Sequence, residues 1–95
     1  MSLEVTDEPQ RHRYVARLDD AEAGFLSYQV ADNVAVSLIH TQVDPAYEGH
    51  GVGGRLARFA LEDARRRGWL VRPLCPFVRS WMTRHPDFDD LVIRR

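Results

Sequence analysis

Three short segments in the first half of the chain have the hydrophobic pattern of β-strands: the second alternates with a period of two, and the third is rich in β-branched residues. Turn-forming residues separate the segments at Asp19–Glu22 and at Asp32–Asn33, and Pro45 ends the third segment. Because the first connection is short, the first two strands should pair as an antiparallel hairpin. The expected strands cover residues 13–18 (RYVARL), 24–30 (GFLSYQV) and 34–43 (VAVSLIHTQV).

The second half of the chain changes to the spacing of a helix, followed by one more strand and a final helix. Apolar residues recur with roughly helical spacing over residues 51–67, and Gly68 stands where a helix end favours glycine. Residues 69–75 (WLVRPLC) predict a short strand, and a last helix over residues 77–84 should stop before Pro86. The order β-β-β-α-β-α favours a parallel pairing of the third and fourth strands through a right-handed crossover.

A chain of 95 residues is expected to form one domain, and 44% hydrophobic and 28% charged residues are ordinary for a globular protein. We expect residues 1–12 to be a flexible segment and residues 13–95 to be the folded domain. The only cysteine, Cys75, cannot form an internal disulfide, which favours a reducing compartment such as the cytoplasm. No apolar run approaches the roughly 20 residues of a membrane-spanning helix, so no membrane partner is expected.

The net charge of −1 hides an asymmetry between the two halves of the chain. Residues 1–47 hold 3 arginines and 8 acids (−5), and residues 48–95 hold 10 arginines and 6 acids (+4), with no lysine anywhere. The absence of lysine excludes the phosphate-binding loop that ends in Gly-Lys-Ser/Thr. A basic second half suits an anionic small ligand. A nucleic-acid partner is not expected, because the chain is slightly acidic and its one arginine run, Arg65–Arg67, is short.

Four glycines in six positions precede the long helix, in the stretch YEGHGVGG of residues 47–54. Glycine loses much backbone freedom on folding, so this density indicates a tight turn, a left-handed backbone or a closely approaching ligand. The first N–H groups of a helix have no partner inside the helix, and the helix dipole is positive there. A pyrophosphate could lie on these N–H groups. The alternative is a turn between strand and helix that binds nothing.

The residues around these glycines carry a more specific pattern. The stretch VDPAYEGHGVGGRLARFALEDARRRG resembles the acetyl-coenzyme A binding motif of the GCN5-related N-acetyltransferases, in which [Q/R]-x-x-G-x-[G/A] joins a strand to an amphipathic helix. Glu48 stands where that motif has Gln or Arg, and we expect its carboxylate to point away from the pyrophosphate. From His40 to Phe88 the chain resembles the minimal YidJ-like or NATD1-like branch of the family.

The resemblance implies an α+β fold of the three-layer α/β type, with a small mixed, mainly antiparallel sheet whose last two strands are parallel and splayed. It implies that acetyl-coenzyme A enters between those strands, with its pantetheine arm or thioester near Val43, its pyrophosphate on the loop N–H groups and a phosphate near Arg55. The residues that should bind acetyl-coenzyme A are Val43, Gly49, His50, Gly51, Val52, Gly53, Gly54 and Arg55.

Two side chains near the expected cleft have suitable chemistry for catalysis. His40 is our candidate general base, because histidine transfers protons near neutral pH; a structural hydrogen bond at the strand end is the alternative. Cys75 is the second candidate, as a transient acetyl carrier or as a proton donor to the departing thiolate, with a small buried hydrophobe as the alternative. The last helix offers Trp81 and Met82 where larger relatives often have a tyrosine acid. No metal is expected, because the spacing of paired zinc ligands is missing.

The predicted function is the transfer of an acetyl group from acetyl-coenzyme A to a primary amine. Larger relatives carry helices between the first two strands, whereas this chain has only a turn, so we expect an open acceptor side and a bulky acceptor such as a protein lysine or N-terminus. One alternative is a non-catalytic module that binds coenzyme A or acetyl-coenzyme A. Another is a protein-interaction domain in which the glycine loop is only a turn. A monomer or a weak homodimer is expected.

Overall fold

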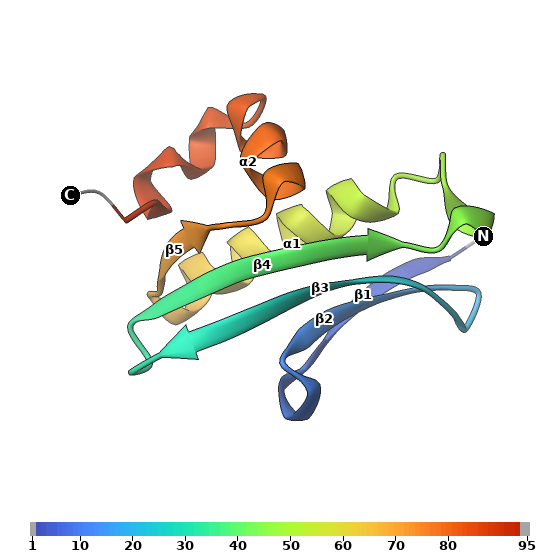
Figure 1. Ribbon diagram of the computed structural model, residues 1–95, viewed down its shortest axis with the longest axis horizontal. Coiled ribbons are helices and arrows are strands. Elements are labelled where there is room, and N and C mark those ends of the chain that lie inside the picture. The colour runs from blue at the N-terminus through green and yellow to red at the C-terminus, as the bar shows by residue number, and fades with distance from the viewer. Residues whose placement is uncertain (1, 94–95) are drawn as a thin grey trace.

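The computed structural model describes residues 2–93, which fold around one five-stranded sheet (Figure 1). The strands lie in chain order; neighbouring strands are antiparallel up to β4, and β4 and β5 are parallel. The strands are β1 Leu3–Glu8, β2 Arg13–Leu18, β3 Ala21–Ala31, β4 Ala35–Val43 and β5 Leu70–Pro73. The helices are α1 Val52–Arg67 and α2 Pro76–Thr83, with short 3-10 helices η1 Pro9–Arg11, η2 Pro45–Tyr47 and η3 Pro86–Leu91.

The six elements expected between residues 13 and 84 are confirmed, with shifts of a few residues at their ends. Helix α1 ends at Arg67, and Gly68 follows in the left-handed conformation with φ of 73°. The N–H group of Trp69 then donates to the carbonyl of Ala64 at 2.9 Å, which satisfies one of the free carbonyls at the helix end. Strands β4 and β5 are parallel, as the crossover between them predicts.

The flexible segment expected over residues 1–12 is wrong for the described part of that segment. Strand β1 occupies most of it and pairs with β2 along its whole length. Leu3 and Val5 pack against the core, whereas Glu8 lies on the other face and accepts a hydrogen bond from Arg17 of β2 at 3.1 Å. The acids of this segment favour a loose end only when the segment is considered alone, because Arg17 of β2 and Arg67 of α1 pair with Glu8 and Asp7 in the folded chain.

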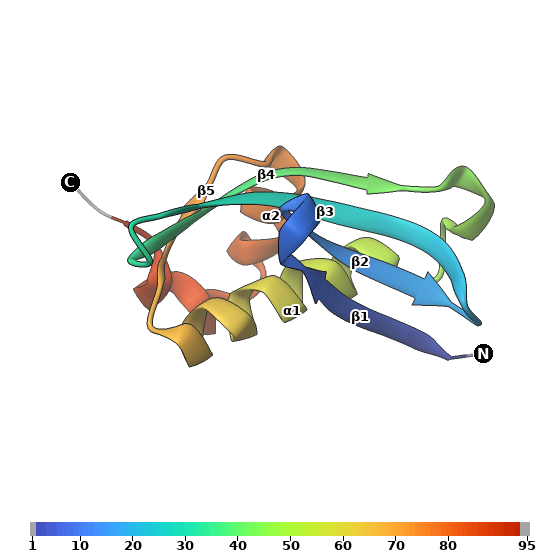
Figure 2. The same ribbon diagram turned by 90° about the horizontal axis from the view of Figure 1, so that it is seen from below.

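Both helices lie on the same face of the sheet (Figure 2), so the described residues form two layers where three are expected. Helix α1 contacts all five strands, and α2 contacts β4, β5 and α1. Beyond β5, Val92 forms a parallel bridge with Val71. The chain therefore makes two successive parallel connections, from β4 to β5 and from β5 to Val92, that move along the sheet in the same direction. Two right-handed crossovers in one direction place both helices on one face. The other face carries no helix in residues 2–93.

Candidate functional site

The two parallel strands separate halfway along β4. Pairing between β4 and β5 covers only Ala35–Leu38 of β4. The carbonyl of Leu38 accepts hydrogen bonds from the N–H groups of Leu74 and Cys75, at 3.0 and 2.9 Å. After this point the chain turns into α2, whereas β4 continues to Val43. In the part of the chain that the structure describes, the second half of β4 therefore has no strand on that side, and the expected splayed pair is confirmed.

A β-bulge at Ile39 decides which side chains face the gap between the strands. The register between β3 and β4 shifts by one residue after Leu38, so Ile39 is an extra residue in β4. One extra residue reverses the alternation of faces along the strand. Leu38 and Thr41 therefore both face the helices although they are three positions apart, whereas His40 faces the open side of the sheet.

The loop before α1 presents a row of N–H groups without partners. Within the described residues, none of the backbone N–H groups from Gly49 to Gly54 donates a hydrogen bond to a carbonyl or a side chain. Gly49 and Gly51 have φ of 86° and 75°, in the left-handed region that favours glycine. These N–H groups lie at the positive end of a 16-residue helix, which is a suitable binding surface for a phosphate group.

The last two glycines of the loop allow close packing between the helices. A Cβ atom on Gly53 would lie 2.8 Å from Cζ of Phe77, and a Cβ atom on Gly54 would lie 3.3 Å from Nε1 of Trp81. Neither glycine has the left-handed backbone of Gly49 and Gly51. The four glycines therefore have two separate roles, one in shaping the loop and one in letting α2 approach α1.

These elements enclose a cavity of about 390 Å³, which we call the loop cavity, between the end of β4, the glycine loop and α2. Phe77 forms one wall from the first turn of α2 and is 41% exposed. Tyr47 forms another part of the wall; sequence reasoning missed it as a lining residue, although it directly precedes the motif. The residues that line the loop cavity are Val43, Tyr47, Glu48, Gly49, Gly51, Val52, Gly53, Gly54 and Phe77.

Six of the eight residues expected to bind acetyl-coenzyme A therefore meet around one cavity, and two do not line it. His50 is exposed in the loop. Arg55 is exposed as well, and its guanidinium donates to the carbonyl of Leu3 at 3.2 Å, which ties α1 to β1. Glu48 contributes to the lining, although we expect its carboxylate to point away from a bound pyrophosphate.

Cys75 lies immediately before α2 and is buried, with 2% of its surface exposed. Its sulfur lies 3.3 Å from Oγ1 of Thr41, across the gap between the two strands. Burial is the largest influence on the thiol and raises its pKa. Hydrogen bonds from the Thr41 hydroxyl and from the backbone at Val78, Phe77 and Thr41 act in the other direction, and together they leave the pKa of Cys75 below its ordinary value. The site therefore favours the thiolate.

His40 faces the opposite side of β4. It is exposed, and its ring lies edge-on to Phe25 of β3 with 6.2 Å between the ring centres. Thr41, the next residue, contacts Cys75 on the helix side of the strand. The structure therefore does not bring His40 and Cys75 into contact, although the sequence predicts both near the cleft between the splayed strands. A catalytic role for His40 requires an acceptor that approaches from the open face of the sheet.

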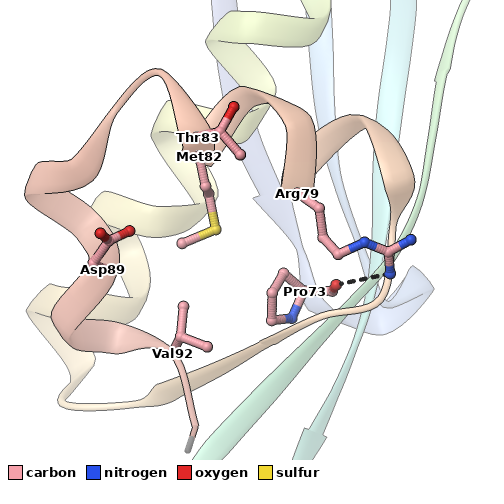
Figure 3. Close-up of a pocket in the computed structure, with 6 residues that line it drawn as sticks. All are labelled: Pro73, Arg79, Met82, Thr83, Asp89 and Val92. Carbon is pink, nitrogen blue, oxygen red and sulfur yellow. Dashed lines mark hydrogen bonds between the residues drawn. The ribbon is translucent and has the colours of Figure 1, made fainter.

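A second cavity of about 380 Å³ lies on the other side of α2, beside β5 and η3 (Figure 3). Met82 and Val92 point into it, and Arg79 donates a hydrogen bond to the carbonyl of Pro73 at 3.4 Å. None of its lining residues belongs to the glycine loop or to β4, so we place the candidate site in the loop cavity. The second cavity is lined by Pro73, Arg79, Met82, Thr83, Asp89 and Val92.

Other classes of site have little support in residues 2–93. No group of three His, Cys, Asp or Glu side chains gathers there in a way that could hold a metal ion. His85 is instead stacked on the indole of Trp81, with 3.5 Å between the ring centres, and its Nδ1 lies 2.8 Å from the Trp81 carbonyl. No helix in this range combines the length and the apolar character needed to cross a membrane.

A mixed sheet with a splayed parallel pair and a glycine loop at a helix start defines a class of acyl-transferring proteins. The family model described as GCN5-related N-acetyl-transferase matches residues 13–91. The chain therefore belongs to the GCN5-related N-acetyltransferase family and carries its acetyltransferase domain. Among curated relatives, Protein NATD1 of Mus musculus is 26% identical over 85 residues, covering 88% of this chain and 77% of the relative. Protein NATD1 of Homo sapiens is 25% identical over 85 residues, covering 88% and 75%.

Solved structures of the family share the fold. A GCN5-like protein of Staphylococcus aureus, determined by NMR, superposes with a TM-score of 0.72 and 20% identity, covering 98% of this chain and 90% of its own. The crystal structure of ribosomal-protein-alanine N-acetyltransferase from Brucella melitensis superposes with a TM-score of 0.61 and 18% identity, covering 87% of this chain and 62% of its own. At these identities the likeness shows the fold alone.

Proposed function

We propose that this protein transfers an acetyl group from acetyl-coenzyme A to a primary amine, and that the amine is a protein lysine or N-terminus. The observation that carries the proposal is the row of unpartnered N–H groups from Gly49 to Gly54, which borders the loop cavity beside the gap between β4 and β5. None of the residues that line the loop cavity is a cation. A diphosphate bound there would therefore depend on hydrogen bonds from these backbone N–H groups.

The residues around the loop cavity fit coenzyme A. Its diphosphate would be held by N–H groups of the glycine loop, where Gly49 and Gly51 carry no side chain and adopt the left-handed backbone that shapes the loop. Apolar side chains of Val43, Val52 and Phe77 provide walls for an alkyl chain such as the pantetheine arm. Glu48 is the one acid in the lining, and it is exposed, so water can screen its charge.

Backbone and side-chain groups of this protein can polarise the thioester and transfer the protons. Bound acetyl-coenzyme A supplies an activated acetyl thioester. The free edge of β4 beyond Leu38 offers backbone N–H groups that can polarise a carbonyl. Cys75, with its lowered pKa, can exchange a proton beside the gap, and His40 can accept a proton from an amine on the open face.

The open face suits a macromolecular acceptor. No helix covers this face in the described residues, and Ile39 and Leu74 are 42% and 50% exposed where β4 and β5 separate. Uncovered apolar side chains beside a site fit a partner with its own apolar surface better than a small polar amine. The Brucella structure is named for the alanine of a ribosomal protein, which agrees with a protein N-terminus as acceptor.

Acetyl-coenzyme A at about 100 times its dissociation constant is expected to stabilise the protein by about 2.7 kcal/mol, and to raise its melting temperature by about 10–20 °C. Thermal unfolding with and without the ligand measures this shift. In Gly51→Ala the shift should be lost, because a side chain at φ of 75° changes the loop that presents the N–H groups.

Gly68→Ala is the matched control for that experiment. Gly68 has φ of 73° at the opposite end of α1, and a Cβ atom at Gly68 or at Gly51 would meet nothing within 4 Å. Both variants therefore carry the same backbone strain, but Gly68→Ala should keep the full ligand shift. Equal shifts in wild type and Gly51→Ala, or no shift in wild type, would contradict the assignment of the loop cavity.

Cys75→Ser and His40→Ala are expected to keep the ligand shift and to lose about 100-fold in the rate of acetyl transfer to a peptide amine, the usual contribution of a proton-transferring group. Mass spectrometry after incubation with acetyl-coenzyme A distinguishes two roles of Cys75. An acetyl group on Cys75 that passes to added amine supports a covalent route, and its absence supports direct attack. A wild-type protein that binds but transfers nothing to any amine would instead be a binding module for coenzyme A.

A further inference from the structure

Thr41 is the side chain that joins β4 to the start of α2 across the gap. It is half-buried, it lies two positions after the bulge, and its hydroxyl is 3.3 Å from the sulfur of Cys75. No property of the residue type marks it in the sequence. In an uninterrupted strand that buries Leu38, the alternation of faces would place His40 beside the helices and Thr41 on the open face. The extra residue at Ile39 exchanges the two.

The other groups around the sulfur are backbone donors. Hydrogen bonds from the backbone at Phe77, Val78 and Thr41 favour the thiolate, as does the position of Cys75 at the amino end of α2. Ionisable side chains near the sulfur either bind other groups or point away from it. Arg79, one turn along α2, donates to the carbonyls of Pro73 and Leu74.

His40, on the adjacent position of β4, faces the open side of the sheet beside Phe25. Among the described residues, the Thr41 hydroxyl is therefore the one side-chain hydrogen-bond partner of the Cys75 thiol. Because a hydroxyl rotates to suit its neighbour, it can donate to a thiolate or accept from a thiol. It can thus serve Cys75 in both protonation states.

We propose that Thr41 is a positioning residue for Cys75, and that the β-bulge at Ile39 turns the Thr41 hydroxyl onto the sulfur. The hydroxyl holds the thiol at the point where β4 and β5 separate and favours its ionised form. The inference rests on the proposed role of Cys75 in acetyl transfer, but the contact itself can be tested without that role.

The test follows the ionisation of Cys75 directly in the free, folded protein. Because the chain has 1 cysteine, protein labelled with 13C at cysteine Cβ gives a single cysteine signal, and its NMR shift reports the thiol over a pH titration. Thr41→Val removes the hydroxyl at nearly constant volume, and its titration midpoint should lie above that of the wild type. Thr41→Ser keeps the hydroxyl and should titrate with the wild type. Thr83→Val is the control, because the Thr83 hydroxyl donates to the Ser80 carbonyl, away from the site.

Acetyl transfer to a peptide amine should fall about tenfold in Thr41→Val, the effect of one hydrogen bond to a charged group, and recover in Thr41→Ser. A wild-type midpoint in Thr41→Val, or an elevated midpoint in Thr41→Ser, would overturn the proposal. Thr41→Ala provides a second variant without the hydroxyl if the valine variant does not fold. A raised midpoint in Thr41→Val together with full transfer by Cys75→Ser would support the contact and reject the proposed catalytic role of Cys75.

Discussion

Replacing Asp63 with alanine should lower the free energy of unfolding by about 3 kcal/mol, and the melting temperature by about 12–24 °C. Asp63 is a buried acid in the second half of α1. Its carboxylate accepts hydrogen bonds from the Tyr14 hydroxyl at 2.8 Å, from Nε of Arg67 at 3.0 Å and from Arg66. Alanine leaves the buried Tyr14 hydroxyl without an acceptor and both arginines without their shared anion.

The effect should be large because Asp63 belongs to a network that fastens α1 to three strands. Arg67 also donates to Asp7 of β1 at 3.1 Å, and Asp7 accepts from the Tyr28 hydroxyl at 2.6 Å. Burial, and next the hydrogen bond to a carboxylate, raise the pKa of both Tyr14 and Tyr28 above the usual value. Both tyrosines therefore remain protonated donors at neutral pH.

Chemical and thermal unfolding measure the loss, and two further variants define its cause. Asp63→Asn should cost less than Asp63→Ala, because an amide oxygen can still accept from Tyr14. Glu62→Ala is the matched control on the same helix, since Glu62 is exposed and its pairing with Arg58 at 3.8 Å should contribute less than about 0.5 kcal/mol. Similar losses for Glu62→Ala and Asp63→Ala would show that the network does not stabilise the fold.

Gly24→Ala should lower the free energy of unfolding by about 3 kcal/mol, at the upper end of what overpacking costs. A Cβ atom on Gly24 would lie 2.6 Å from the carbonyl oxygen of Gln42 and 3.2 Å from Cα of Val43. These are backbone atoms in the paired strand β4, so they cannot rotate aside as a side chain can. The ends of β3 and β4 must therefore separate to admit one methyl group.

The same substitution should also weaken acetyl-coenzyme A binding, because Cγ1 of Val52 lies 3.2 Å from the added atom and both Val43 and Val52 line the loop cavity. Gly54→Ala is the matched control for stability. There the nearest atom is Nε1 of the Trp81 side chain at 3.3 Å, which needs to move by only a few tenths of an ångström. Alanine also gains helix propensity, so the loss should be well below that of Gly24→Ala. Denaturant unfolding compares the variants, and a Gly24→Ala protein as stable as wild type would refute the packing described at the end of β4.

Local patterns were sufficient for the six elements from β2 to α2 and for the glycine loop. The alternation in β3 and the helical spacing of α1 reflect which face is buried, and this information is carried by neighbouring residues. The loop residues Gly49 and Gly51 were recognisable because a strand, a glycine cluster and a helix follow one another in the chain. Strand β1 was missed because its acids find their partners, Arg17 of β2 and Arg67 of α1, only when the chain is folded.

The sequence by itself determined the order of the elements from β2 to α2, the family resemblance and the place of the glycine loop, since these depend on residues close together in the chain. Only the tertiary structure decided that Gly53 and Gly54 serve the contact between α1 and α2, that both helices lie on one face of the sheet, and that Thr41 rather than His40 meets Cys75. The physical reason is the same in each case. A contact distance between two elements, or a one-residue shift in register, depends on how distant segments pack and leaves no periodic signal in either segment.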